Sequence, residues 1–204
     1  MPTIAVILGR VSTEDSDRVF ETIEALDPSV SGEECEIVIA DRLEDTLTKR
    51  IRANHPQVRL IACPSEMSLP EMRTLAFEAS TAPIVAVTED HCVPTPGWAR
   101  SITKAFEQGG SELVAVGGSV VNGATGSGLD WATFLCEYSF FSPPVTEGSA
   151  DILPGMNVAY RRSALESIPR HLLISGFWET TVHPVLLKTG SRFLSLNELV
   201  MLHK

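Results

Sequence analysis

Short apolar runs alternate with amphipathic helical segments through the first half of the chain, and this alternation limits the folds that the sequence can adopt. Residues 3–8, 35–40, 58–62 and 84–87 are apolar runs, the third weaker than the others, and they predict buried strands. Between them apolar residues recur at helical spacing, as in the segment that Pro70 opens. Strands and helices that alternate in this way predict an α/β domain with a largely parallel sheet. Ligands of such sheets bind at the carboxyl ends of the strands.

The second half of the chain is less regular. Residues 113–121 predict a strand, residues 130–141 an aromatic-rich helix, and residues 199–203 a strand that ends in histidine. No internal repeat, low-complexity tract or shift in composition divides the 204 residues, so we expect one domain over residues 1–204. Ser12 or Thr13 is expected to cap the helix after the first strand.

The run Thr88-Glu89-Asp90-His91 follows the fourth predicted strand and carries the most chemical information. An acidic residue and an imidazole two positions apart on an extended segment point to the same side and can bind one ion. A Pro-x-Pro-Gly-Trp segment, residues 94–98, then begins a helix.

With these flanking residues the sequence resembles the family 2 glycosyltransferases, whose sheet presents an Asp-x-Asp motif to a metal before a Pro-x-Pro-Gly-Trp-like helix start. Aligned on Trp98, the two metal-facing positions are Glu89 and His91, so Glu-Asp-His replaces the usual motif. The resemblance implies a GT-A fold, which is a Rossmann-like three-layer α/β sandwich with a mixed, mostly parallel central sheet. It also implies a nucleotide-binding part up to about residue 98 and an acceptor-side part over residues 99–204.

The resemblance further implies a divalent cation, manganese or magnesium, that neutralises the charge growing on a departing diphosphate. A nitrogen ligand shifts the preference from magnesium towards manganese or another transition ion. Many GT-A enzymes return a C-terminal histidine to the metal, and His203 matches it, so the expected ligands are Glu89, His91 and His203. Asp90 is expected to place the nucleotide, or to meet the metal or the ribose in place of Glu89.

Two residues of the first half match donor-binding positions of that family. Asp41, at the end of the second strand, matches the acidic residue that contacts the base or ribose of the nucleotide. Arg73 matches the arginine that precedes the metal motif by one helix and one strand. The alternative for each is a solvated surface charge.

Two segments of the second half match the family's sugar and acceptor positions. Residues 153–162 resemble its Gly-Gly-Asn-x-x-x-Arg-Arg segment, with Pro154 in place of the first glycine and Gly155 and Asn157 kept. The glycine would let backbone approach the sugar or acceptor. Glu179 and Thr180 lie where the family has a Glu-Asp pair that supplies the catalytic base, so Glu179, the one carboxylate of the pair that remains, is the expected base. Asn157 and Trp178 would shape the pocket. The alternatives are an ordinary turn and a helix-start glutamate stabilised by the helix dipole.

Aromatic side chains gather over residues 131–141, where the family has its acceptor side, although an aromatic helix more often belongs to the core. The net charge of −10 argues against a nucleic-acid partner. No apolar stretch approaches the roughly 20 residues of a membrane span, and the N-terminus lacks the features of a secretory signal. We therefore expect a cytoplasmic protein. The resemblance leaves peripheral membrane contact open, because relatives often continue into helices that touch a membrane.

The expected reaction is metal-assisted transfer of a sugar from a nucleotide diphosphate sugar to a hydroxyl of a saccharide, lipid or other acceptor. The resemblance implies a hexosyltransferase-like enzyme that inverts the anomeric centre. A catalytically degenerate domain that only binds the sugar nucleotide is one alternative. A sugar nucleotidyltransferase is another, for which residues 9–12 (Gly-Arg-Val-Ser) provide one glycine and one arginine after the first strand. A Rossmann dehydrogenase would need Gly-x-Gly-x-x-Gly there, and the sequence lacks it.

Overall fold

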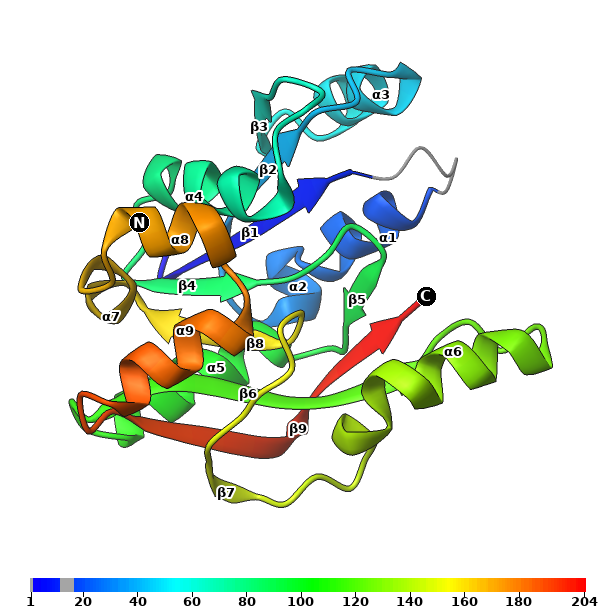
Figure 1. Cartoon of the computed structure of the whole chain (residues 1–204). Helices are drawn as coiled ribbons and strands as arrows, with labels where there is room; N and C mark the ends of the chain where they lie inside the picture. Colours follow the sequence, from blue (N-terminus) through cyan, green and yellow to red (C-terminus); the bar gives the residue numbers. More distant parts are fainter. Residues whose placement is uncertain (1, 12–16) are drawn as a thin grey trace.

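The computed structural model describes residues 2–11 and 17–204, and its strands form one sheet (Figure 1). The strand order is β3-β2-β1-β4-β8-β6-β9-β5, and β7 pairs with β9 off this path. The strands are β1 (Ile4–Arg10), β2 (Cys35–Asp41), β3 (Arg59–Ala62), β4 (Ile84–Val87), β5 (Cys92–Pro94), β6 (Leu113–Asn122), β7 (Gly148–Ala150), β8 (Val158–Arg161) and β9 (Arg192–His203).

The sheet is mixed, and its longest ladders are parallel. β1 pairs in parallel with β2 and β4, β2 with β3, and β6 with β9. β8 runs antiparallel between β4 and β6, while β5 and β7 run antiparallel to β9. The expected mixed, mostly parallel sheet is confirmed.

Helices cover both faces of the sheet and make the fold three layers deep (Figure 1). α1, α3, α5 and α6 pack on one face, and α4, α7, α8 and α9 pack on the other. Along β1 the side chains of Ile4, Val6 and Leu8 belong to one core and that of Ile7 to the other, as the pleat requires. The helices are α1 (Arg18–Ala25), α2 (Pro28–Ser31), α3 (Thr46–Asn54), α4 (Leu69–Ala79), α5 (Trp98–Gln108), α6 (Gly128–Tyr138), the 3₁₀ turn η1 (Ser139–Phe141), α7 (Arg162–Glu166), α8 (Arg170–Gly176) and α9 (Glu179–Leu187).

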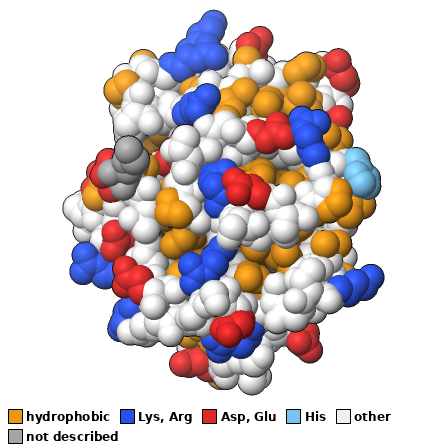
Figure 2. Space-filling model, turned by 90° about the vertical axis from the view of Figure 1, so that its left-hand side faces the viewer, with side chains coloured by type: hydrophobic (Ala, Val, Ile, Leu, Met, Phe, Trp, Pro, Cys, Tyr) orange, Lys and Arg blue, Asp and Glu red, His pale blue; other side chains and the backbone are white. Residues whose placement is uncertain are grey.

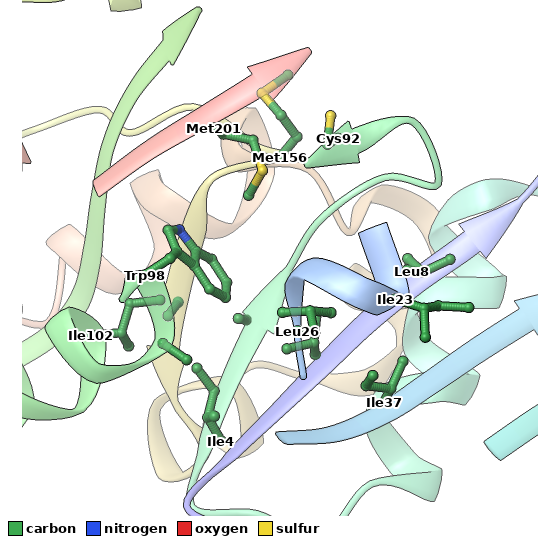
Figure 3. Close-up of a cluster of buried hydrophobic side chains, with 14 of the residues drawn as sticks. Ile4, Leu8, Ile23, Leu26, Ile37, Cys92, Trp98, Ile102, Met156 and Met201 are labelled. Atoms are coloured by element: carbon green, nitrogen blue, oxygen red, sulfur yellow. The ribbon is translucent and has the colours of Figure 1, made fainter. Parts of the chain in front are cut away.

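The first core extends from β1 and β2 to the end of the sheet where β5 meets β9 (Figure 3). Ile23 of α1 and Leu26, which follows that helix, lie over the β1 side, and Trp98, the first residue of α5, packs into the same core. Gly97 has a φ of 80°, a left-handed conformation that favours glycine, and it turns the chain from β5 into α5 so that Trp98 faces inward. Cys92 lies at the far end of this core, near Met156 and Met201.

Several element ends differ from the sequence-based expectation. α4 begins at Leu69 with Ser68 and Glu71 forming a capping box, so Pro70 is its second residue and does not open it. β9 starts at Arg192, well before residue 199, because its parallel pairing with β6 carries polar side chains into the strand. α3 has a strongly polar sequence, which does not predict a helix. Asp45 caps its first turn, and its residue Ile51 is buried in the core. The expected cap at Ser12 or Thr13 lies outside the described residues.

A buried polar pair in the second core links β8 to α9. The hydroxyl of Tyr160 and Nε2 of His183 are 2.8 Å apart, and both side chains are buried. Nδ1 of His183 has no hydrogen-bond partner among the described residues. Burial lowers the pKa of His183 to about 4, so the imidazole is neutral in the folded protein at neutral pH.

We expect the buried histidine to make the fold less stable in mild acid. An unfolded histidine titrates near pH 6.5, so between about pH 6.5 and 4 the unfolded chain binds a proton that the folded chain does not. Above about pH 6.5 this effect is absent. Between pH 6.5 and 4 it lowers the free energy of unfolding by about 3 kcal/mol in total, at roughly 1.4 kcal/mol per pH unit.

His183→Gln keeps a polar partner for Tyr160 without this titration. Urea unfolding at a series of pH values should show a shallower loss for His183→Gln than for the wild type, while His171→Gln, at an exposed site on α8, should follow the wild type. Parallel curves for wild type and His183→Gln would contradict the assignment.

The surface carries charges of both signs. On the face shown in Figure 2, basic and acidic side chains are interspersed among hydrophobic ones. Arg170 of α8 pairs with Glu78 of α4 in one exposed contact, and such surface pairs contribute little to stability. Among the described helices, none combines the length and apolar character needed to cross a bilayer.

Candidate active site

Four side chains with metal-binding atoms meet where β4 ends and β5 pairs with β9. They are Glu89, His91, Cys92 and His203, whose donor atoms all lie within 4.8 Å of one another. After β4 the chain makes a turn, closed by a 3.1 Å hydrogen bond from the Cys92 amide to the Glu89 carbonyl. β5 then pairs antiparallel with β9 and sets Cys92 opposite His203. The segment is therefore a turn, not the extended run that we expected, but the turn still brings Glu89 and His91 together.

The spacing of three of these donors fits a divalent cation. Nε2 of His91 lies 3.1 Å from Nε2 of His203 and 3.4 Å from Oε2 of Glu89. Nε2 of His203 lies 3.9 Å from the same carboxylate oxygen. Ligands bound at about 2.0–2.2 Å to one ion are roughly 3–4 Å apart, so these atoms have the separations of a shared coordination shell.

Asp90 stands behind His91. Its Oδ1 lies 3.0 Å from Nδ1 of His91, the arrangement in which a carboxylate holds the imidazole so that Nε2 is free for a metal. Burial acts to lower the pKa of His91, but the Asp90 hydrogen bond and the charges of Glu89 and Asp90 outweigh it and raise that pKa. Burial and the nearby positive charge of His91 lower the pKa of His203 to about 4. Contact of Asp90 with a nucleotide stays a prediction.

Cys92 is the member of the group that sequence reasoning missed. Its side chain is fully buried, and burial together with the charges of Glu89 and Asp90 raises the pKa of the thiol. Metals bind the thiolate, so the protonated thiol is the weakest of the four donors. Its position next to His91 was the available signal, but an isolated cysteine in an apolar run looks like a core residue.

A pocket of about 160 Å³ opens beside the donor group, and Glu179 lies in its wall together with Glu89. β8 runs antiparallel to β4, so the residues before Val158 reach the end of the sheet where Glu89 lies. α9 begins at Glu179 on the same side. The lining residues are Arg73, Glu89, Glu137, Tyr138, Phe141, Pro154, Gly155, Met156, Trp178 and Glu179. The structure thus brings Arg73, Gly155, Trp178 and Glu179 to the expected metal ligand.

Gly155 lies directly against the carboxylate of Glu179. A Cβ atom at residue 155 would overlap the Glu179 carboxylate, and the nearest atom would be Oε2. The absence of a side chain therefore makes room for the carboxylate. Approach of the Gly155 backbone to a sugar or acceptor stays a prediction.

Asp41 is placed differently from the expectation of a nucleotide contact. Its carboxylate is 1% exposed, and Oδ2 accepts hydrogen bonds from Arg10 at 2.8 Å and from Thr48 at 2.6 Å. Oδ1 accepts from the Leu43 amide. Arg10 also pairs with Asp45, so it is engaged in this cluster and not available to phosphates, as a nucleotidyltransferase loop would require. Ser12 of that loop lies outside the described residues, and contact of Asp41 with a nucleotide stays a prediction.

Asn157 has a structural role in place of the expected sugar contact. Its side chain is completely buried, and its Oδ1 accepts from Trp98 Nε1 at 2.8 Å. Its Nδ2 donates to the Ser119 and Leu199 carbonyls, both at 2.9 Å. The amide thereby joins α5, β6 and β9 under the site, and it does not line the pocket.

The aromatic segment divides between core and surface. Phe134 is buried, while Tyr138 lines the pocket and its ring lies 4.6 Å from that of His203. Phe140 is 78% exposed, and Trp131 is also exposed. The interpretation as core therefore holds for Phe134, whereas the acceptor role stays a prediction for the others.

Residues 14–168, more than half of the chain, match the model of "Glycosyl transferase family 2". No curated protein sequence matches the chain.

Solved structures share the fold over 98% of this chain at low sequence identity. The mannosyltransferase PcManGT from Pyrobaculum calidifontis, solved with GDP-Man and Mn2+, is 16% identical and superposes with a TM-score of 0.63. TarS 1-349 from S. aureus, solved with UDP-GlcNAc, is 13% identical with a TM-score of 0.65. The match covers 56% and 57% of those chains, so this chain spans little more than half of their length.

Proposed function

Because the chain belongs to glycosyl transferase family 2, we propose that it transfers a sugar from a nucleoside diphosphate sugar to an acceptor hydroxyl. One observation carries the proposal: a carboxylate at the start of α9, Glu179, shares a pocket with Glu89 of a four-donor group that fits a divalent cation. A base for the acceptor and a counter-charge for the diphosphate are the two groups that such a transfer needs. The GDP-Man and UDP-GlcNAc bound by the solved relatives support this class of donor.

The transfer is a single displacement that inverts the anomeric centre of a hexose-type donor. The acceptor oxygen forms a bond to the anomeric carbon as the bond from that carbon to the diphosphate oxygen breaks. The acceptor proton passes to the Glu179 carboxylate, and the nucleoside diphosphate leaves with the electron pair of the broken bond. Gly155 leaves space for Glu179, and Trp178 forms the pocket wall beside it.

Glu89, His91 and His203 would hold the cation, and Asp90 orients His91 from behind. The bound ion supplies positive charge that stabilises the departing diphosphate. Two imidazoles in the set favour manganese or another transition ion over magnesium, and the Mn2+ of PcManGT supports that choice.

Residues 1–98 would bind the nucleotide, with Asp41 near the base or ribose, and residues 99–204 would form the acceptor side. The acceptor would be a saccharide, a lipid or another hydroxyl compound. Peripheral membrane contact would occur through the exposed apolar side chains of α6 and η1: Leu129, Trp131, Leu135 and Phe140.

The proposal predicts that a sugar nucleotide stabilises the fold in a metal-dependent way. A ligand at about 100 times its Kd adds about 2.7 kcal/mol of stability, which is roughly a 5–10 °C rise in Tm for a chain of this size. A thermal-shift screen of UDP, GDP and their sugars, each with Mn2+, Mg2+ or EDTA, checks it. We expect one nucleotide base to raise Tm with Mn2+ and to lose most of the shift in EDTA. No shift from any donor with either metal would overturn the proposed function. A shift without transfer to any acceptor would favour a domain that only binds the donor.

A further inference from the structure

Arg73 connects the two halves of the candidate site. It lies on α4 with 1% of its surface exposed, and its Nη2 donates to Oε1 of Glu89 at 3.2 Å. Its Nη1 donates to the Phe177 carbonyl at 3.1 Å, and its guanidinium carbon lies 4.5 Å from the centre of the Trp178 ring. One side chain therefore contacts both the turn after β4 and the segment that leads into α9.

The contact with Glu89 separates the two oxygens of that carboxylate. Arg73 binds Oε1, while Oε2 is the oxygen that faces the Nε2 atoms of His91 and His203. A guanidinium that binds one oxygen holds the carboxylate plane in place. Glu89 is thereby presented with a single oxygen towards the imidazoles.

The contacts at the other end of Arg73 fix the start of α9. Phe177 and Trp178 immediately precede Glu179, and Trp178 is the N-cap residue of that helix. A hydrogen bond to one of these residues and stacking on the other restrain the backbone from which Glu179 projects. Burial lowers the pKa of Arg73, whereas the charges of Glu89 and Glu179 raise it, so both carboxylates interact with this one cation.

Stability alone does not explain an arginine at this position. Its Nε is buried without a hydrogen-bond partner in the part of the chain that the structure describes. A buried donor without a partner destabilises a fold, and buried arginine pairs can often be replaced by apolar residues of similar volume. Both Nη atoms are already engaged with the protein, which leaves the side chain poorly placed for the expected contact with a nucleotide.

We propose that Arg73 is a positioning residue that sets Glu89 for the cation and Glu179 for the acceptor through the same guanidinium. This inference rests on the proposed function. It gives Arg73 a different role from the donor contact that the sequence predicted. Its consequence is that metal affinity and turnover depend on Arg73 through its contacts with Glu89 and with the start of α9.

The test uses Arg73→Met, which keeps much of the volume and removes the charge, and Arg73→Lys, which keeps the charge without the planar fork. Arg170→Met, at the exposed pair on α8, is the matched control. Calorimetry with Mn2+ should show a Kd about 10–100-fold weaker for Arg73→Met and an intermediate loss for Arg73→Lys. The affinity for GDP or UDP at saturating Mn2+ should be unchanged in both, as should all values for Arg170→Met.

A double-mutant cycle separates positioning from general damage to the fold. If Arg73 acts on the ion through Glu89, Arg73→Met should weaken Mn2+ binding much less in a Glu89→Gln background than in the wild type. Arg73→Lys carries the same comparison if Arg73→Met does not fold. Equal Mn2+ affinity in wild type and Arg73 variants, or a selective loss of GDP or UDP binding at saturating Mn2+, would overturn the positioning role and leave the proposed function intact. A wild-type protein that binds neither Mn2+ nor a donor would overturn both.

Discussion

Replacing Glu179 by glutamine should lower the rate of sugar transfer by about 10²–10⁴-fold, the usual contribution of a positioned general base. The amide has nearly the same shape as the carboxylate, so the close packing against Gly155 and the start of α9 should be kept. It cannot accept the acceptor proton. Single-turnover transfer measured with saturating donor and Mn2+ should show the loss in kcat, while calorimetry should give a donor Kd within about threefold of the wild type.

Glu137 provides the matched control for this variant, because its side chain lines the same pocket from α6. Glu137→Gln changes the charge of the pocket as Glu179→Gln does, but it should keep transfer within a few-fold of the wild type. The reverse pattern would move the role of base from Glu179 to Glu137. If neither variant loses activity, the base lies elsewhere and the proposed displacement is wrong.

The fold was predictable because the strands that define it are apolar on both faces. β1, β2 and β4 are continuous apolar runs because helices cover both sides of the sheet. β8 lies between β4 and β6 but covers only four residues, Val158–Arg161, and it looked like part of a turn. Its place in the sheet depends on pairing with strands far away in the sequence, which local periodicity does not contain.

The sequence predicted which residues lie at the site better than it predicted the hydrogen bonds that those residues make. Spacing around Trp98 pointed to Glu89 and His91, and the structure brings His203 to them although it is 112 residues away from His91. The sequence gives no sign that Asp41 would pair with Arg10, which is 31 residues distant and already buried in β1. The surroundings of Asn157 were likewise not predictable. Its side-chain amide donates to carbonyls of two strands, and only the packed fold shows that the side chain is buried.

Replacing His91 by alanine should weaken Mn2+ binding by at least about 100-fold and lower kcat by about 10²–10³-fold at limiting metal. Its Nε2 lies closer to Oε2 of Glu89 and to Nε2 of His203 than those two atoms lie to each other, so its loss removes the donor that contacts both. Asp90 would also lose the imidazole that it holds. Calorimetry with Mn2+ and transfer assays over a range of metal concentrations measure the two effects.

Excess metal distinguishes this variant from one that lacks the base. If His91 serves only to hold the ion, raising Mn2+ should restore part of the activity of His91→Ala, whereas no concentration of Mn2+ should rescue Glu179→Gln. His171→Ala, on the exposed side of α8, controls for the loss of a histidine, and its affinity for Mn2+ should be that of the wild type.

Cys92→Ser tests the fourth donor. The protonated, buried thiol should contribute little to a Mn2+ site, so its loss should change the Kd for Mn2+ by only a few-fold. A much larger effect of Cys92→Ser than of His91→Ala would assign the site to a metal that prefers sulfur, such as zinc, and would shift the coordination from the diphosphate side towards the core.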